Sequence, residues 1–130
     1  MDYTVEFDKQ QFDRIEAVLK RELIALGVAN VLLIDLAGNV LVQLDDGRTQ
    51  HDVYSLAALA AGNFGAVSAM ARLIGEEDFS LLFHKGKKES IHFTKVADEL
   101  LLVTIFGKDV SLGFLRLKVA EAVDRIRELI

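Results

Sequence analysis

The chain has 130 residues, 52% hydrophobic and 27% charged, and contains neither cysteine nor proline. That length and composition fit one folded globular domain, residues 1–130. Without cysteine there are no disulfides, thiolate zinc sites or cysteine nucleophiles, and a net charge of −5 disfavours a nucleic-acid-binding protein. The first residues lack the basic and apolar segments of a signal peptide, so we expect a cytoplasmic protein.

The first predicted helix begins after Asp8, an N-cap residue. Gln11 completes a capping box with it, and Phe7 is placed to form a hydrophobic staple. Apolar residues then recur at helical spacing, namely Phe12, Ile15, Leu19, Leu23 and Leu26. Gly27 can adopt a left-handed conformation and end the helix.

A β-hairpin follows this helix. Residues 28–35 contain the apolar run VLLI, which is typical of a strand that is covered on both faces. Residues 36–39 include a glycine and predict a turn. Val40, Val42 and Leu44 then alternate with more polar residues and predict the returning strand.

Residues 53–71 form a helix without a single charged residue, capped by Thr49 or Asp52 and ended by Gly75. One side of this helix carries a bulky stripe with Asn63 in its middle: Leu56, Leu59, Ala60, Val67, Met70 and Ile74. The other side carries small residues: Ala57, Ala61, Gly65 and Ser68. We expect the bulky stripe to pack on the domain and the small side to contact another backbone.

Two alternatives remain for this helix. A membrane span fits its length, but the glycines, serines and asparagine within it and the lack of flanking interfacial anchors argue against a membrane. Complete burial inside a monomer would require more layers than a chain of this size usually forms.

The second half of the chain predicts three strands and a helix. The strands are expected at residues 79–84, 90–96 and 100–106, with a lysine-rich turn at residues 84–88. The last strand is the most apolar and belongs at the centre of the sheet. Ser111 is expected to cap the final helix, whose apolar positions are Leu112, Leu115, Val119, Val123, Ile126 and Ile130.

The predicted order is α-β-β-α-β-β-β-α, an α+β fold with a five-stranded, mainly antiparallel sheet. The first and last helices are both amphipathic and are expected to lie together on one face, with the central helix on the other. Strands lie about 4.8 Å apart and a helix is only about 10 Å wide, so one helix cannot cover five strands. We therefore expect a homodimer.

No catalytic motif is present. Gly86-Lys87 and Gly107-Lys108 lack the other residues of a phosphate-binding loop. His84 and His92 flank one hairpin, but a zinc site would need two further ligands. We therefore expect no metal, no cofactor and no enzymatic activity. The lysine-rich turn is expected to be solvated, with contact to an acidic partner as the alternative.

Four segments together resemble the roadblock dynein light-chain domain, and within it the bacterial MglB-type proteins that partner the Ras-like GTPase MglA. These segments are LLIDLAGNVL from Leu32, LAALAAGNFGAVSAMARLIGEEDF from Leu56, FHKGKK from Phe83 and LLLVTIFGKDVSLGFLRLKVAEAV from Leu100. The resemblance implies a dimer that joins two sheets edge to edge and pairs the central helices. It also implies that the dimer docks a small Ras-like GTPase over those helices and accelerates GTP hydrolysis without lending an arginine finger.

These implications give residue-level hypotheses. The dimer interface is expected at Ala57, Ala61, Gly65, Ser68, Phe79, Leu81 and Phe83. The GTPase-binding candidates are Tyr54, Ala58, Gly62 and Arg72. The alternative function is a non-catalytic dimerisation or scaffold module of a larger complex. A small-ligand sensor is a third and weaker interpretation, because Asn63 is the one polar side chain inside the apolar stripes.

Overall fold

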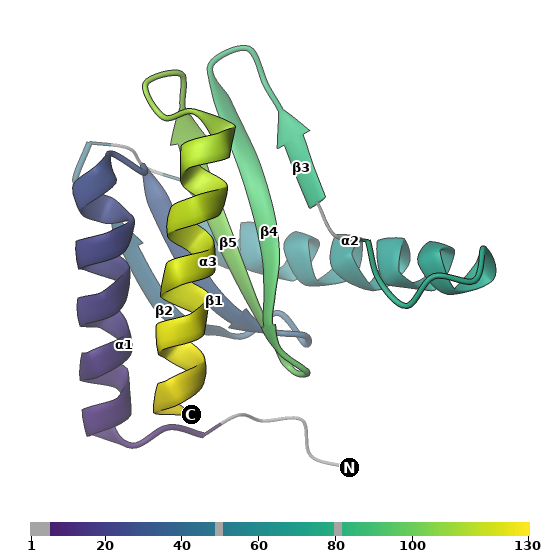
Figure 1. Cartoon of the computed structure of the whole chain (residues 1–130), viewed down its shortest axis with the longest axis horizontal. Helices are drawn as coiled ribbons and strands as arrows, with labels where there is room; N and C mark the ends of the chain where they lie inside the picture. The colour runs from purple at the N-terminus through teal and green to yellow at the C-terminus, as the bar shows by residue number, and fades with distance from the viewer. Residues whose placement is uncertain (1–5, 49–50, 80–81) are drawn as a thin grey trace.

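A five-stranded antiparallel sheet with helices on both faces forms the computed structural model, which describes residues 6–48, 51–79 and 82–130 (Figure 1). The strands are β1 (Asn30–Asp35), β2 (Val40–Asp45), β3 (Leu82–Lys85), β4 (Glu89–Ala97) and β5 (Leu100–Gly107). Their order across the sheet is β2-β1-β5-β4-β3, and every neighbouring pair is antiparallel.

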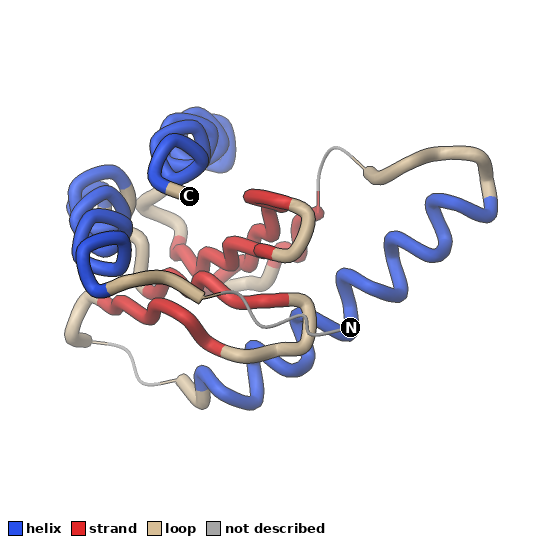
Figure 2. Tube along the Cα trace, turned by 90° about the horizontal axis from the view of Figure 1, so that it is seen from below, coloured by secondary structure: helices blue, strands red, loops and turns tan. Residues whose placement is uncertain are grey.

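Two helices, α1 (Lys9–Glu22) and α3 (Leu112–Leu129), lie on one face of the sheet. The third helix, α2 (Val53–Leu73), lies on the other (Figure 2). A short 3-10 helix, η1 (Ile24–Leu26), links α1 to β1. The predicted α+β class, element order and distribution of helices are thus confirmed.

The two central strands contribute to two separate cores. Every residue of β1 is buried, and β5 is buried up to its last residue. Alternate side chains point to opposite faces, so Val31 and Leu102 join the core beneath α1 and α3, whereas Leu32 and Leu101 join the core beneath α2. Burial on both faces explains the continuous apolar runs in the sequence.

Helix α1 begins as its sequence predicts. The Asp8 carboxylate accepts from the Gln11 backbone N–H at 2.8 Å, and the Gln11 side chain accepts from the Asp8 N–H at 3.0 Å, completing the capping box. The Phe7 ring packs edge-on against Phe12, with centroids 5.4 Å apart, as the staple. The α-helix ends at Glu22, earlier than expected, and Gly27 ends η1 instead with φ of 107°.

An ion cluster joins α1 to α3. The Glu22 carboxylate is only 9% exposed and lies 3.9 Å from Lys118 Nζ and 3.6 Å from Arg125 Nε, both on α3. Arg21 lies 3.4 Å from the same carboxylate. Because a buried carboxylate needs compensating charge, this cluster fixes how the two helices pair.

The β1–β2 hairpin turn is organised by a buried carboxylate. Asp35 is 2% exposed, and its Oδ1 accepts from the backbone N–H of Ala37 at 3.0 Å and of Asn39 at 2.8 Å. Gly38 occupies the turn with φ of 91°. This turn lies against α2, so the hairpin and the helix position each other.

One edge of the sheet is uneven in the described part of the chain, where β3 pairs with Ser90–Phe93 of the longer β4. Beyond that pairing, Arg127 of α3 reaches the free edge of β4. Its Nε donates to the Val96 carbonyl at 2.6 Å, and its Nη2 donates to the Lys95 carbonyl at 3.5 Å. Of the predicted strand at residues 79–84, residues 80–81 lie outside the described part of the chain, and the described strand β3 (Leu82–Lys85) extends one residue further than predicted.

Candidate protein-binding surface

Helix α2 starts at a strong polar cap. The Asp52 carboxylate accepts from the Ser55 hydroxyl at 2.7 Å and from the Ser55 backbone N–H at 3.1 Å. These two hydrogen bonds lower the pKa of Asp52 below its ordinary value, because they favour the charged form. The cap thus sets where the helix begins.

The inward side of α2 is built mainly from small residues. Its buried members are Ala57, Ala60, Ala61, Phe64, Ser68 and Ala71. Ala57, Ala60, Ala61 and Phe64 pack on Leu32, Ile34, Phe93, Leu101 and Val103 of the sheet, and the Ser68 hydroxyl donates to Asp78 in the connector after α2. Large side chains on the sheet and small ones on the helix let the two backbones approach closely. The expectation that Ala57, Ala61 and Ser68 face a second copy is therefore wrong, because the sheet covers the two alanines and Ser68 is buried beside Asp78 of the same chain.

The outward side carries the bulky residues. Five large apolar side chains on and just after α2 are more than half exposed: Tyr54 76%, Leu59 71%, Met70 53%, Leu73 85% and Ile74 70%. The predicted inward stripe is thus wrong for Leu59, Met70 and Ile74, although Ala60 does face inward and Leu56, Asn63 and Val67 are half-buried. Water contacts a large apolar surface here, which is a common sign of a protein interface.

The other predicted contact residues differ in where they lie. Gly65 is exposed, with open space where a side chain would stand, and Tyr54, Ala58, Gly62 and Arg72 are exposed on the same helix. Phe79 is 40% exposed, beside α2. Phe83 instead stacks on Phe106, with centroids 6.0 Å apart, on the face that α1 and α3 cover. Leu81 lies outside the described residues.

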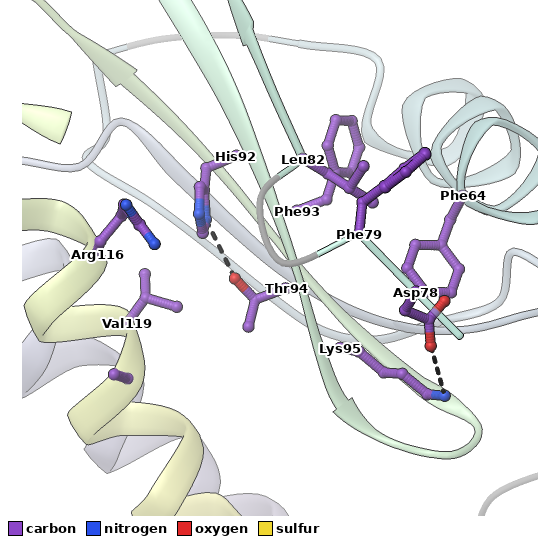
Figure 3. Close-up of a pocket in the computed structure, with 11 residues that line it drawn as sticks. Phe64, Asp78, Phe79, Leu82, His92, Phe93, Thr94, Lys95, Arg116 and Val119 are labelled. Carbon is purple, nitrogen blue, oxygen red and sulfur yellow. Dashed lines mark hydrogen bonds and ion pairs between the residues drawn. The ribbon is translucent and has the colours of Figure 1, made fainter. Parts of the chain in front are cut away.

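A pocket of about 290 Å³ opens at the edge of β4, between α2 and α3 (Figure 3). On the α2 side, Phe64, Phe79, Leu82 and Phe93 form an apolar wall. Asp78 closes one end of that wall by pairing with Lys95 at 3.6 Å and accepting from the Ser68 hydroxyl at 3.1 Å. The connector after α2 is thereby held against the sheet.

On the α3 side of this pocket, His92 faces Arg116 (Figure 3). His92 is 5% exposed, and burial, with a smaller contribution from the Arg116 charge, lowers its pKa to about 4. The imidazole is therefore neutral near pH 7. Its Nδ1 lies 3.1 Å from the Thr94 hydroxyl, and in the described part of the chain no carboxylate contacts it. A catalytic acid–base pair is not assembled there.

The two hairpin histidines cannot share a ligand. His84 pairs with Ile91 and packs edge-on against Phe93, whereas His92 pairs with Phe83, so their side chains point to opposite faces of the sheet. Within residues 6–48, 51–79 and 82–130, no three His, Cys, Asp or Glu residues gather in a group that could hold a metal ion.

Comparison with known proteins identifies the fold. The family model of the Roadblock/LC7 domain matches residues 14–106, which is more than half of the chain. The chain belongs to the Roadblock/LC7 domain family. A comparison with curated proteins gave no match.

Among solved structures, this Roadblock/LC7 chain is similar to Myxococcus xanthus MglB, with 36% identity, a TM-score of 0.83 and coverage of 91% of this chain and 95% of that one. The gliding protein MglB from Thermus thermophilus is 27% identical over 99% of this chain and 97% of that one, with a TM-score of 0.89. An MglB structure described as having a tetrameric arrangement is 26% identical over 99% and 96%, with a TM-score of 0.90.

By length and composition alone, α2 of this Roadblock/LC7 domain could also cross a membrane. Its inward side is nevertheless covered within the domain, where Ala57 packs on the sheet and neither Ala57 nor Ala71 has exposed surface. Helix α2 is thus apolar on both sides: small residues are buried on one side, and bulky residues are exposed on the other.

Proposed function

We propose that this Roadblock/LC7 protein is a homodimeric regulator that binds a small Ras-like GTPase in the cytoplasm and stimulates its GTP hydrolysis. The likeness to MglB structures over nearly the whole chain supports the choice of partner. The observation that carries the proposal is the outward face of α2, where Leu59, Met70 and Leu73 are more than half exposed.

Two strips along α2 suit two different partners. Leu59 and Met70 project from one strip, and pairing this strip with its copy would bury both residues in a dimer. Tyr54, Ala58 and Gly62 follow one another at four-residue spacing along an adjacent strip, which would remain open after such pairing. We assign this second strip, with Arg72 near its end, to the GTPase.

The stimulation is indirect in this proposal. The sequence has no phosphate-binding loop, so the nucleotide belongs to the partner. A bound regulator can shift the GTPase towards an active arrangement only by the difference between its binding free energies for that arrangement and for the others. Arg72 lies in the last turn of α2, where the helix dipole favours a cation, and it lines a cavity with Asp78 and Lys95. We assign Arg72 a binding role and no role as an arginine finger.

The experiment is single-turnover GTP hydrolysis by the cognate GTPase, titrated to saturation with wild type and Arg72→Ala. We expect Arg72→Ala to weaken binding by about 1 kcal/mol, roughly fivefold in Kd, because exposed charges contribute little. The hydrolysis rate at saturation should stay close to that of wild type. The matched control is Arg14→Ala, which removes an exposed arginine from α1 on the opposite face.

Loss of several orders of magnitude in the saturated rate of Arg72→Ala would contradict the mechanism without a finger. Binding of wild type without any stimulation would instead support the scaffold function. Absence of binding across the whole titration would reject the GTPase partner altogether.

A further inference from the structure

A pocket rimmed with lysines lies at one end of the sheet, on the face that α1 and α3 cover. It has a volume of about 370 Å³ and forms where the β3–β4 turn meets the loop between β5 and α3. Figure 1 places these two segments at the same end of the molecule. The stacked rings of Phe83 and Phe106 form part of its apolar floor. Three exposed lysines stand at the rim of this lysine-rimmed pocket: Lys85, Lys88 and Lys108.

The register of the sheet brings two of these lysines together. Glu89 pairs with Gly107 where β4 begins and β5 ends, so Lys88 precedes and Lys108 follows the same pair of residues. The two segments are close, since a Cβ on Gly107 would stand 3.7 Å from the carbonyl oxygen of Lys88. Both strands are inner strands of the sheet. A second sheet joined edge to edge beside β3 would therefore border the pocket and leave these two lysines accessible.

The charge of these lysines is not compensated within the described part of the chain. No carboxylate lines the pocket, and none of the three lysines makes an ion pair among the described residues. The acidic residues nearest to them along the chain are Glu89, which pairs with His51 at 3.2 Å, and Asp109, which does not line the pocket. In a chain with a net charge of −5, this local positive charge around an apolar hollow fits a ligand that is both acidic and apolar.

Shape and overall charge favour a protein segment over a membrane surface as the occupant. A volume of about 370 Å³ lies at the small end of the range of ligand sites, roughly 300–1,000 Å³, and suits one or two bulky side chains. Protein partners commonly anchor themselves by inserting such side chains into a pocket. A bilayer has no comparable projection, and an anionic bilayer repels a chain with a net charge of −5.

We propose that the lysine-rimmed pocket docks an acidic segment of a partner protein other than the GTPase. A leucine or aromatic side chain of that segment packs on Phe83 and Phe106, and flanking aspartates or glutamates pair with Lys88 and Lys108. This is the contact with an acidic partner that the lysine-rich turn left open as an alternative. Helix α2 lies on the opposite face of the sheet, so the docking leaves the proposed α2 contacts open and does not depend on them (Figure 2).

Selection from a peptide library tests the docking without assuming a sequence for the segment. The full chain is immobilised and panned with a phage library of random dodecapeptides, in parallel with a variant that combines Lys88→Glu and Lys108→Glu. We expect wild type to enrich peptides in which a leucine or an aromatic residue is flanked by acidic residues, and the variant not to enrich them. Absence of such peptides from the wild-type pool, or their equal enrichment on both proteins, would overturn the proposal.

Fluorescence polarisation with the most enriched peptide, synthesised with a fluorescent label, then measures the affinity. Lys88→Glu with Lys108→Glu should raise Kd by about tenfold or more, because two attractive contacts become repulsive. The matched control is Lys9→Glu with Lys20→Glu, which changes the net charge equally at exposed positions of α1 and should leave Kd within about twofold. Replacing the apolar residue of the peptide by serine should also raise Kd by about tenfold or more.

Equal weakening by the two protein variants, or unchanged binding of the serine peptide, would show a general charge attraction and overturn the proposal. Two further measurements separate the pocket from α2 and from contacts between copies. In amide NMR spectra, the peptide should shift the signals of residues 83–90 and 106–112 and leave those of residues 53–73 unchanged. Light scattering should give the same mass for wild type and for Lys88→Glu with Lys108→Glu.

Three outcomes would assign the pocket to a different occupant and overturn the proposal. Peptide-induced shifts confined to α2 would place the peptide on the GTPase or dimer surface. A lower mass for the double variant would make the pocket part of a contact between copies. Cosedimentation of wild type with phosphatidylserine vesicles, lost in the double variant, would assign the pocket to a membrane.

Discussion

At the scale of single residues, Gly38 is the point where the β1–β2 turn meets α2. Its φ of 91° is rarely adopted by other residues, and a Cβ there would stand 3.0 Å from the Cα of Ala58. We predict that Gly38→Ala lowers the free energy of unfolding by about 1–3 kcal/mol, because backbone strain and a backbone contact combine.

The matched control for this change is Gly47→Ala, measured with it by urea unfolding. Gly47 also has positive φ, 78°, but open space surrounds its Cβ position. Gly47→Ala should therefore lower the free energy of unfolding by less than Gly38→Ala does, because it adds backbone strain alone. Equal losses at both glycines would show that the contact with Ala58 contributes nothing.

His92 makes stability depend on pH. Burial lowers its pKa from 6.5 to about 4 in the folded chain, whereas the unfolded chain keeps the ordinary value. Between these pH values the unfolded state binds more protons, so stability is complete above pH 6.5 and falls as the pH drops towards 4. We predict a loss of about 2 kcal/mol in the free energy of unfolding between pH 7 and pH 5.

Urea unfolding of wild type and His92→Gln at both pH values checks this prediction. The variant is expected to be less stable at pH 7, since it changes a buried side chain, but it should lack the histidine's share of the pH dependence. The same pH dependence in both proteins would assign the effect to other groups.

At the scale of elements, the sequence predicts most of the architecture because local signals and apolar periodicity agree. The Asp8 capping box, the turn at Gly38 and the Ser111 cap all occur as expected, with the Ser111 hydroxyl accepting from Phe114 N–H at 3.2 Å. The apolar run of β5 correctly predicts a central strand.

The orientation of α2 could not be predicted in the same way. Both of its sides are apolar, so periodicity does not distinguish the inward side from the outward one. The shape of the sheet beneath decides the orientation, because Leu32, Ile34 and Leu101 already fill much of the space and the helix residues opposite them are mainly alanines. The pocket between the β3–β4 turn and the loop after β5 could not be predicted for a related reason, since lining residues such as Phe83 and Lys108 come from segments far apart in the sequence.

The inward orientation of α2 gives a direct prediction. Ala57→Leu adds volume where the side chain is fully buried, so we expect the free energy of unfolding to fall by about 1–3 kcal/mol. The control is Ala66→Leu, an exposed alanine on the same helix, which should change stability by less than about 0.5 kcal/mol. Thermal and urea unfolding measure the stability of both variants. A larger loss for Ala66→Leu than for Ala57→Leu would support the helix orientation that was first expected from the sequence.

At the scale of the whole molecule, the exposed strip of α2 predicts the oligomeric state. We expect wild type to scatter light as a species of at least twice the 14.4 kDa chain mass at micromolar concentration. Leu59→Glu should reduce that mass, because a charge buried in an apolar interface without a partner is costly. Leu117→Glu is the control, since Leu117 is 54% exposed but lies on α3.

A clean monomer for wild type over that concentration range would reject the dimer. If Leu59→Glu and Leu117→Glu reduce the mass of the assembly equally, the dimer interface is not on the exposed strip of α2.

The contact between Arg127 and β4 has a consequence for how this protein behaves at high concentration. Among the described residues, β3 pairs with Ser90–Phe93 of β4, and a strand edge beyond such pairing is a template on which an extended chain could add and start aggregation. The guanidinium occupies the carbonyls of Lys95 and Val96 that such a chain would need. A side chain that ties α3 to β4 can thus also hinder the addition of a further strand at this edge.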